Sequence, residues 1–427
     1  MRESQEIVIV GAGQGGLSVS YFLAKSRINH VVLERGLIGD SWKSRRWDSF
    51  CLVTPNWSIK LPGAHYSGDA PDGFMPRDEF TDYLEIWANG FGAPVRTGVE
   101  VHRIRRDDAG ARRFALETSA GPMSADIVVV ATATYQKPSV PAVARDIADT
   151  CLQIHAEGYK NPTQAIGAAV LVVGSGQTGC QIAEDFLREG RRVFLSVGKT
   201  GRLPRRYRGR DCIEWQAEMG TLDRTPDMLE TPDHRFKSDP HVSGRDGGAT
   251  VSLNRFRKRG AVLLGRLRSA SGDLLRFKDN LRECIDYADE FAAGVNASVD
   301  RHIESTGQIA PRHSPREIAD EYWPAGLTAK SPETLSLSDS GIGTVIWATG
   351  FNFDFSWIDF PVVDASGYPR TESGASSVPG LFFCGLNWMT KRKSGILYGV
   401  EEDARAVADR IKKLKLAESG PAAWKVA

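Results

Sequence analysis

The chain has 427 residues, of which 41% are hydrophobic and 25% are charged, and its formal net charge is +1. This length predicts two domains with an insert, and the balanced charge excludes the concentrated basic surface of a nucleic-acid-binding protein. No apolar run approaches the roughly 18–20 residues needed to cross a bilayer. The first predicted strand begins at Ile7, which leaves no room for a signal peptide. We therefore expect a cytoplasmic protein that does not insert into membranes.

The six cysteines are spread along the sequence, and no two of them form a CxxC pair. This spacing indicates reduced thiols, because a disulfide framework or a zinc site needs clustered cysteines. We expect no metal site.

A Gly-rich turn opens the chain. The apolar run 7–10 leads into the glycines Gly11, Gly13 and Gly16, and a helical pattern and the strand 31–33 follow, ending at Glu34. In such a turn the glycines permit the tight bend, the close approach of a pyrophosphate and the packing of helix on strand. The phosphates lie on the positive helix N-terminus and the acid binds the ribose. Gly-rich turns also serve plain packing, but this complete context favours a nucleotide.

A long loop rich in Gly, Pro and Trp is expected at residues 39–76. Asp78 is the expected N-cap of the helix that follows. Short strands are expected from Val95 to Thr132, ending in the apolar run 127–130, which is typical of a buried parallel strand.

The same strand, turn and helix recur about 160 residues later. The run 169–173 leads into Gly174, Gly176 and Gly179, and the next strand ends at Ser196 without an acid. The arginines that follow, Arg202 and Arg205 among them, are what a 2′-phosphate requires, so the charge pattern favours NADPH over NADH. Alternatively, these arginines cover a solvated surface or bind a substrate anion.

The second half of the sequence contains an irregular insert at 198–260 and a helix-period stripe at 281–303, which predicts a helix packed on the body. Strands at 344–350 and 380–385 and a closing amphipathic helix at 400–414 complete the pattern. The predicted fold is α/β with two Rossmann-like dinucleotide-binding domains. The FAD-binding domain is discontinuous, at 1–150 and 320–427, and the NAD(P)H-binding domain with its irregular insert occupies 151–319.

Several segments resemble the class B flavoprotein monooxygenases, the branch of the flavin-containing and Baeyer–Villiger-like enzymes. They are the first Gly-rich turn, GDSW at 39–42 with Arg46-Trp47, HAEGY at 155–159, WATGF at 347–351, and GLFFCG at 380–385 with Ser394-Gly395. Two segments depart from the family. Residues 151–154 lack the leading Phe and Gly of the fingerprint FxGxxxHxxxY, and Ala131-Thr-Ala133 replaces an ATG segment.

This resemblance implies that NAD(P)H reduces FAD and that reduced FAD adds O2 to form a C4a-(hydro)peroxide, which transfers one oxygen atom to a small organic substrate. Such an adduct must be kept dry and hydrogen-bonded. The catalytic candidates are Asn56, His155 and Asn387. Asn56 has a local turn bond as its alternative role, and His155 could instead be a linker histidine bound to a backbone carbonyl.

The expected contacts to FAD or to the nicotinamide cofactor are Gly11, Gly13, Gln14, Gly16, Glu34, Arg35, Trp42, Trp47, Val101, Thr132, Gly174, Gly176, Gln177, Thr178, Gly179, Ser196, Arg202, Arg205, Gly350, Gly385, Ser394, Gly395 and Ile396. Two other functions are weighed against the monooxygenase. One is a two-domain reductase that passes electrons to a quinone or a protein without oxygenation, and the other is a non-enzymatic flavoprotein sensor. A dithiol reductase needs a close cysteine pair, which is absent from the sequence. The sequence leaves open whether the protein is a homodimer.

Overall fold

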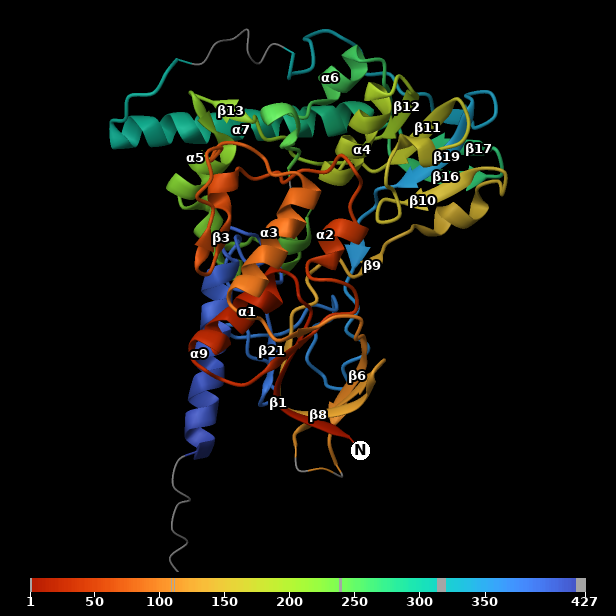
Figure 1. Ribbon diagram of the computed structural model, residues 1–427. Coiled ribbons are helices and arrows are strands. Elements are labelled where there is room, and N and C mark those ends of the chain that lie inside the picture. Colours follow the sequence, from red (N-terminus) through yellow and green to blue (C-terminus); the bar gives the residue numbers. More distant parts are fainter. Residues whose placement is uncertain (1, 109, 111, 238–239, 313–319, 420–427) are drawn as a thin grey trace, which may run out of the picture.

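The computed structural model describes residues 2–108, 110, 112–237, 240–312 and 320–419, which form two α/β units joined by paired connections (Figure 1). The first unit contains a seven-stranded sheet of order β5-β2-β1-β8-β7-β6, with β21 paired to β8. Its strands are β1 (Glu3–Val10), β2 (Val31–Leu33), β5 (Val95–Arg96), β6 (Val101–Arg106), β7 (Phe114–Thr118), β8 (Gly121–Val130) and β21 (Leu381–Phe383). Its helices are α1 (Gln14–Lys25), α2 (Asp40–Ser44), α3 (Arg77–Gly90) and α9 (Val400–Ser419), and the small hairpin β3 (Lys60–Leu61) and β4 (Ala64–His65) lies in the loop before α3.

The central strands of this sheet are buried on both faces, because successive side chains of a strand point to opposite sides. Ile7 and Ile9 of β1 pack in the cluster formed with α1, α3 and α9. Val8 and Val10 pack on the other face, with Phe355 and Phe383. The apolar run at the N-terminus therefore fixes β1 in the middle of the sheet, and its end places the first Gly-rich turn at the sheet edge.

The second unit contains a five-stranded sheet of order β10-β19-β11-β12-β15. Its strands are β10 (Leu152–His155), β11 (Ala169–Val173), β12 (Arg192–Ser196), β15 (Val262–Leu264) and β19 (Ile342–Trp347), all paired in parallel. The long helix α7 (Leu281–Thr306) and helix α4 (Gln177–Arg188) lie near it (Figure 1). The helices expected at 281–303 and 400–414 are confirmed as α7 and α9.

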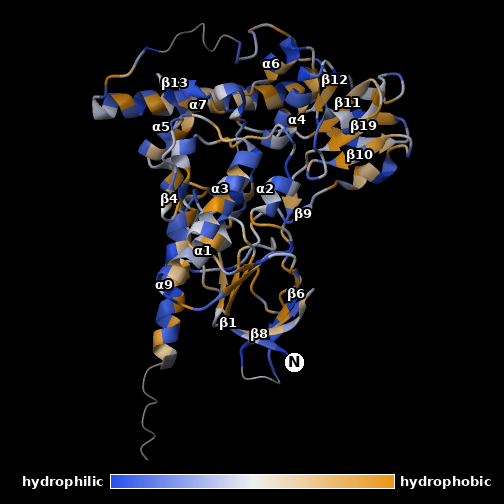
Figure 2. Cartoon of the chain, in the orientation of Figure 1, coloured by the Kyte–Doolittle hydropathy of each residue, from blue (hydrophilic) through white to orange (hydrophobic). Residues whose placement is uncertain are grey.

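The predicted irregular insert at 198–260 contains short regular elements. They are the hairpin β13 (Arg206–Tyr207) and β14 (Arg210–Asp211), helices α5 (Cys212–Glu218) and α6 (Leu253–Lys258), and several single 3₁₀ turns. A three-stranded sheet follows, formed by β16 (Leu267–Ser271), β17 (Leu274–Phe277) and β18 (Thr334–Ser336). Figure 2 shows hydrophobic residues concentrated in strands such as β1, β11 and β19, while the surface helices mix both colours. No helix among the described residues combines the length and the apolar character needed to span a bilayer.

The chain returns from the second unit to the first later than the sequence predicted. The expected return to the first domain at residue 320 is wrong for β18 and β19, because β19 pairs with β10 and β11 in the second sheet. The return lies near Gly350, where β20 (Phe351–Asn352) pairs with β9 (Lys137–Pro138) of the outgoing connection. The sequence of a short apolar strand does not indicate which sheet the strand joins. Its sheet is known only from the strands with which it pairs.

The start of α3 also differs from the expectation. The helix begins at Arg77 after Pro76, which has no side-chain cap bond. Asp78 lies inside the first turn and pairs with Arg77 at 2.8 Å. An acid in the first turn still interacts favourably with the helix dipole.

Candidate functional site

The first Gly-rich turn has the geometry that a bound pyrophosphate needs. Gly11 has φ +108°, and a Cβ atom on Gly16 would lie 1.9 Å from the Gly11 carbonyl oxygen, so both positions require glycine. A Cβ atom on Gly13 would meet nothing within 4 Å. Helix α1 starts at this open position without a side-chain cap, so its first N–H groups are available to an anion. The turn therefore fits the FAD pyrophosphate.

Glu34 stands at the end of β2, beside this turn. Its Oε2 accepts a hydrogen bond from the Ala12 N–H at 2.8 Å, and its Oε1 accepts one from the Gly36 N–H at 3.0 Å. Each carboxylate oxygen can accept a further bond, so Glu34 can also hold ribose hydroxyls. Arg35 is exposed. Val101 begins β6, and it is Val99 whose N–H bonds to the Glu34 carbonyl.

Gln14 connects three segments that the resemblance places around the flavin. Its Oε1 accepts from the Trp42 indole N–H at 3.0 Å, and its Nε2 donates to the Gly395 carbonyl at 3.1 Å. A Cβ atom on Gly15 would lie 3.1 Å from the Cα of Gly385, so the C-terminal segment lies directly against α1. Ser394 is buried, its Oγ accepts from the Thr390 and Lys391 N–H groups, and Ile396 is half-buried beside it.

The tryptophan loop packs on itself. Trp42 lies edge-on to Phe80, with ring centroids 4.9 Å apart, and Trp47 lies edge-on to Phe50 at 5.1 Å. The Arg46 guanidinium lies 5.6 Å from the Trp42 ring and 5.2 Å from the Tyr135 ring. Trp42 is thus positioned by Gln14 and by its ring neighbours, whereas Trp47 is core material near the second unit.

The second turn repeats the first in detail. Gly174 has φ +104°, and a Cβ atom on Gly179 would lie 1.9 Å from the Gly174 carbonyl oxygen. Helix α4 starts after Gly176 without a side-chain cap, and Gln177 and Thr178 occupy its first turn. This open helix N-terminus fits the pyrophosphate of a nicotinamide nucleotide.

In both units, another segment of the chain passes directly behind the Gly-rich turn. A Cβ atom on Gly11 would lie 2.6 Å from the Ala131 carbonyl oxygen, and one on Gly174 would lie 2.4 Å from that of Ala348. Thr132 follows Ala131 and its Oγ1 accepts from Gln136 at 3.1 Å. Gly350 follows at the equivalent crossing and is exposed, with φ +84°.

The residues expected to bind a 2′-phosphate are used inside the protein. Ser196 is buried, and its Oγ donates to the Gly265 carbonyl and accepts from the Leu267 N–H, both at 3.0 Å. The Ser196 carbonyl accepts from the Gly174 N–H, just as the Leu33 carbonyl accepts from the Gly11 N–H in the first turn. Ser196 is therefore equivalent to Leu33, and the next residue, Val197, is equivalent to Glu34. The expectation for Ser196 was therefore one position out of register.

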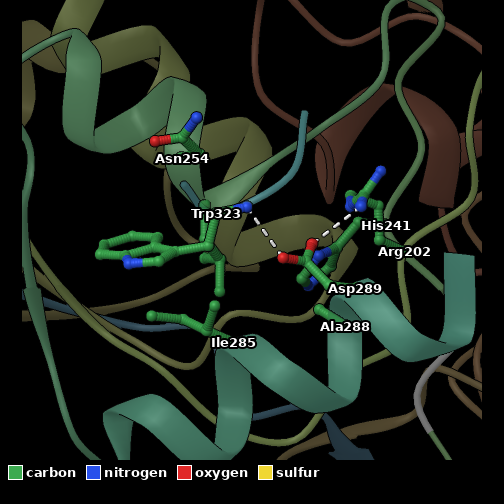
Figure 3. A pocket seen from close by; sticks show the side chains of 8 residues that line it. Arg202, His241, Asn254, Ile285, Ala288, Asp289 and Trp323 are labelled. Atoms are coloured by element: carbon green, nitrogen blue, oxygen red, sulfur yellow. Dashed lines mark hydrogen bonds and ion pairs between the residues drawn. The ribbon is translucent and has the colours of Figure 1, made fainter. Parts of the chain in front are cut away.

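Arg202 and Arg205 are 1% and 2% exposed. The Arg202 guanidinium lies 2.8 Å from Asp289 and 3.2 Å from Glu321, and Figure 3 shows it directed at Asp289 on α7. The Arg205 guanidinium lies 2.7 Å from Asp211. Carboxylates of the chain therefore neutralise both cations, so neither arginine is open to a 2′-phosphate. A sequence shows the charge of an arginine but not its burial, which is why this prediction failed.

Each of the three catalytic candidates makes a hydrogen bond to its own neighbourhood. The Asn56 Nδ2 donates to the Ala70 carbonyl at 3.0 Å and its Oδ1 accepts from the Met75 N–H at 2.8 Å, so the amide ties its own loop together. The His155 Nε2 donates to the Gly350 carbonyl at 3.1 Å, and burial lowers the pKa of this ring. These are the alternative structural roles considered for both residues. Asn387 is half-buried, and its N–H donates to Thr134 at 3.2 Å, close to the crossing behind the first turn.

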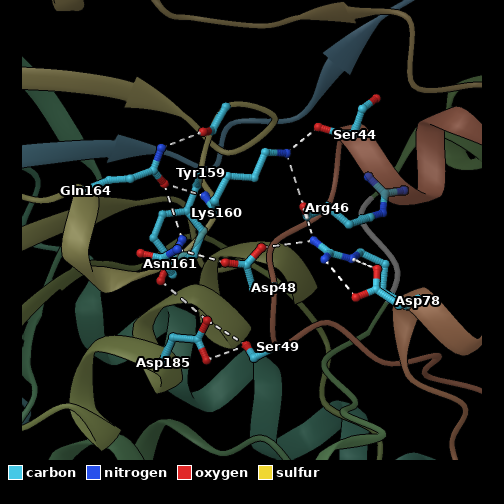
Figure 4. A network of polar contacts seen from close by, with 12 residues as sticks. Ser44, Arg46, Asp48, Ser49, Asp78, Tyr159, Lys160, Asn161, Gln164 and Asp185 are labelled. Carbon is cyan, nitrogen blue, oxygen red and sulfur yellow. Dashed lines mark hydrogen bonds and ion pairs between the residues drawn. The ribbon is translucent and has the colours of Figure 1, made fainter. Parts of the chain in front are cut away.

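A polar network joins the two units. Asp185 on α4 is buried, and its carboxylate accepts from the Ser49 hydroxyl at 2.7 Å and from the Tyr159 hydroxyl at 3.4 Å (Figure 4). It also accepts from the Arg245 guanidinium. Asp48 accepts from the Asn161 amide at 2.7 Å in the same region. HAEGY is thus a segment that docks the tryptophan loop on the second unit. Nothing in the sequence pattern marked Asp185, because an acid within a helix is ordinary surface material.

The described residues hold no group of His, Cys, Asp and Glu side chains that could bind a metal ion. All six cysteines, each within the described ranges, are free. Five are buried, and Cys51 is half-buried with its thiol pKa raised to about 11, chiefly by burial. None of the six is therefore set up as a thiolate nucleophile.

Residues 8–209 match the family model of the pyridine nucleotide-disulphide oxidoreductases. The chain is 31% identical to an uncharacterized CzcO-like oxidoreductase of Geobacillus kaustophilus, over 96% of this chain and 99% of that protein. It is 32% identical to the indole-3-pyruvate monooxygenase YUCCA1 of Oryza sativa, over 47% of this chain and 50% of that protein. A flavin-containing monooxygenase from Stenotrophomonas maltophilia has the same fold, with a TM-score of 0.63 at 18% identity over 96% of this chain and 99% of that chain. These comparisons confirm the predicted α/β fold with two dinucleotide-binding domains.

Proposed function

Because the chain belongs to the CzcO-like family of NAD(P)H-dependent flavoprotein oxidoreductases, we propose that it is a monooxygenase. It uses FAD and NADPH to place one oxygen atom of O2 into a small organic substrate. The monooxygenase names of YUCCA1 and of the Stenotrophomonas enzyme agree with this reaction.

The observation that carries the proposal is the bridge made by Gln14 between Trp42 and Gly395. Through this bridge the first Gly-rich turn, the tryptophan loop and the C-terminal segment meet at the start of α1. A dithiol reductase would need a cysteine pair beside the flavin, but Cys384 is buried and burial raises its pKa. The segments that meet at the start of α1 instead offer aromatic and amide groups, which would exclude water from a bound cofactor and hold it in place.

Bound FAD would supply the redox chemistry, by accepting a hydride from the nicotinamide and then reacting with O2. The chain supplies position. The α1 N-terminus and Glu34 would hold the adenosine and pyrophosphate part of FAD, and the α4 N-terminus would hold the nicotinamide nucleotide. Gln14 fixes the indole of Trp42 over the same turn.

Rapid mixing tests this reaction. The protein is reduced with NADPH in the absence of O2 and then mixed with oxygenated buffer. A long-lived species absorbing in the near ultraviolet, followed by label from isotopic O2 in an amine, sulfide or ketone product, supports the monooxygenase. Immediate reoxidation with stoichiometric hydrogen peroxide, together with fast turnover of a quinone, would instead establish a reductase that passes electrons to an external acceptor.

A further inference from the structure

Residues 241–248, called the strap here, lie across the second Gly-rich turn. The His241 Nε2 bonds to the carbonyl oxygen of Ser175, the residue between the first two glycines of that turn. The side chains of Gln177 and Gln181, at the start of α4, donate to the Val242 carbonyl at 3.3 and 3.2 Å. The strap is therefore fastened to the turn and to the helix that begins there.

The bond to Ser175 defines the state of His241. A carbonyl oxygen can only accept, so the ring carries its proton on Nε2. The side chain is 1% exposed, and its Nδ1 has no hydrogen-bond partner. Burial and the nearby Arg202 lower the pKa of the ring to about 4, so the ring is neutral near pH 7. Such a ring is a fixed, uncharged donor.

The planar peptide bond carries this contact to the other side of the turn. In a trans peptide the carbonyl and the following N–H point in opposite directions. Because the Ser175 carbonyl faces His241, the Gly176 N–H faces away from the strap. Gly176 is the N-cap of α4, where a pyrophosphate would lie.

The first turn has the same device made from backbone. The Ala12 carbonyl, which corresponds to that of Ser175, accepts from the Gly39 N–H at 3.0 Å. Both turns thus hold the carbonyl between their first two glycines from outside. Only the second turn uses a side chain for this purpose, and a side chain can be changed without altering the backbone.

We propose that His241 is a positioning residue for the nicotinamide cofactor: by holding the Ser175 carbonyl, it aims the Gly176 N–H at the pyrophosphate. This role rests on the second turn as the NADPH site. It predicts that His241 matters for nucleotides that carry a pyrophosphate and not for those that lack one.

The test measures binding of NADP⁺ and of adenosine 2′-monophosphate to the oxidised, FAD-loaded protein by calorimetry. His241→Phe keeps a ring in the cavity but has no donor, and His241→Gln restores an N–H. We expect His241→Phe to weaken NADP⁺ binding about tenfold, the size of one lost hydrogen bond. It should leave the affinity for adenosine 2′-monophosphate and the FAD content unchanged, and His241→Gln should recover most of the NADP⁺ affinity.

Gln181→Leu is the matched control, because it loosens the strap without touching Ser175. Unchanged NADP⁺ affinity in His241→Phe would overturn the proposal. So would equal weakening of both nucleotides, or equal weakening by Gln181→Leu, since either result means that the strap is merely structural. If His241→Phe does not fold, unchanged NADP⁺ affinity in His241→Ala overturns the proposal. If the unaltered protein binds neither nucleotide, the cofactor assignment itself is wrong.

Discussion

The two Gly-rich turns share one skeleton and differ in what surrounds it. The Gly11 N–H donates to the last residue of β2 at 2.8 Å, and the Gly174 N–H donates to the last residue of β12 at 3.1 Å. Behind the first turn, the Ala131 N–H donates to the last residue of β1 at 2.9 Å. Behind the second turn, the Ala348 N–H donates to the last residue of β11, also at 2.9 Å. The spacing of the glycines therefore produces the same turn twice.

The surroundings separate the two turns. The first has Glu34 beside it and is tied to the C-terminal segment by the hydrogen bond from Gln14 to Gly395. The second has Val197 in the place of Glu34 and is held by the strap through His241. We infer that the first turn keeps FAD permanently and that the second exchanges a nicotinamide nucleotide. The turn would thus provide the phosphate site, while its neighbours would decide how the ligand is retained.

The largest expected effect comes from adding one methyl group to the third glycine of each turn. In Gly16→Ala and in Gly179→Ala the new Cβ would lie 1.9 Å from a backbone carbonyl oxygen, which a backbone can relieve only by moving. We expect Gly16→Ala to yield protein without FAD, whereas Gly179→Ala should keep FAD and lose NADP⁺ binding. The flavin absorbance of the purified variants and calorimetry with NADP⁺ measure the two losses. The same loss in both variants would show that the turns are not separate sites.

A buried cation should matter for stability and not for cofactor choice. Arg202→Met leaves Asp289 without its cation and removes one of the two cations beside Glu321, the other being Arg255. Breaking a buried pair in this way costs about 3–5 kcal/mol of the free energy of unfolding. Urea unfolding measures this loss, and the ratio of the NADPH and NADH dissociation constants should not change. Lys199 lies three residues after Ser196, and its Nζ is 2.6 Å from Glu283. This ion pair is exposed and therefore weak, so it can give way to a phosphate, unlike the buried pairs of Arg202 and Arg205. Lys199→Met should lower the preference for NADPH about tenfold, as the loss of one charge-assisted bond would do. A changed ratio in Arg202→Met would restore that arginine to the 2′-phosphate site.

The link between the units gives a smaller effect. Asp185→Asn keeps the shape of the side chain but removes the charge that Ser49 and Arg245 contact. Hydrogen bonds to a charged group contribute about 1.5–3 kcal/mol each, so we expect a loss in that range in urea unfolding. Ser49→Ala removes one donor to the same carboxylate and should lose about 1.5 kcal/mol, the lower end of that range. A double-mutant cycle should give a coupling energy between them; additive losses would mean that the two side chains do not support each other.

The smallest effect concerns the residue two positions after Ala131 in the first unit and two positions after Ala348 in the second. Ala133 has φ +60° in the first unit, where the second unit has Gly350 at φ +84°. A non-glycine residue in this conformation costs about 1–2 kcal/mol, part of which the entropy of an unfolded glycine offsets. Ala133→Gly should therefore raise the free energy of unfolding by about 0.5–1 kcal/mol. Gly350→Ala should lower it by a similar amount, because its Cβ would meet nothing within 4 Å. Thermal unfolding of the two variants measures both changes. Changes of the same sign in the free energy of unfolding would contradict this prediction.

The sequence predicted the elements of this fold wherever glycine spacing or apolar periodicity repeats a local rule. Both turns, the long helix α7 and the closing helix α9 follow from such patterns. It did not predict that β19 belongs to the second sheet, since a short apolar strand fits either sheet equally well. Nor did it predict the burial of Arg202, whose partners on α7 and near residue 321 are distant in the chain.

The two Gly-rich turns and the acid beside the first could be read from the sequence, because a tight bend and a helix start depend on neighbouring residues alone. The contacts that hold each turn, in contrast, depend on the tertiary structure. His241 reaches Ser175 across 66 positions, and Gln14 reaches Gly395 across 381. Such contacts depend on how the whole chain packs, and hydrogen bonds between distant residues leave no periodic trace in the sequence. The contacts that hold the turns are therefore a property of the fold, built around turns that the sequence had already marked.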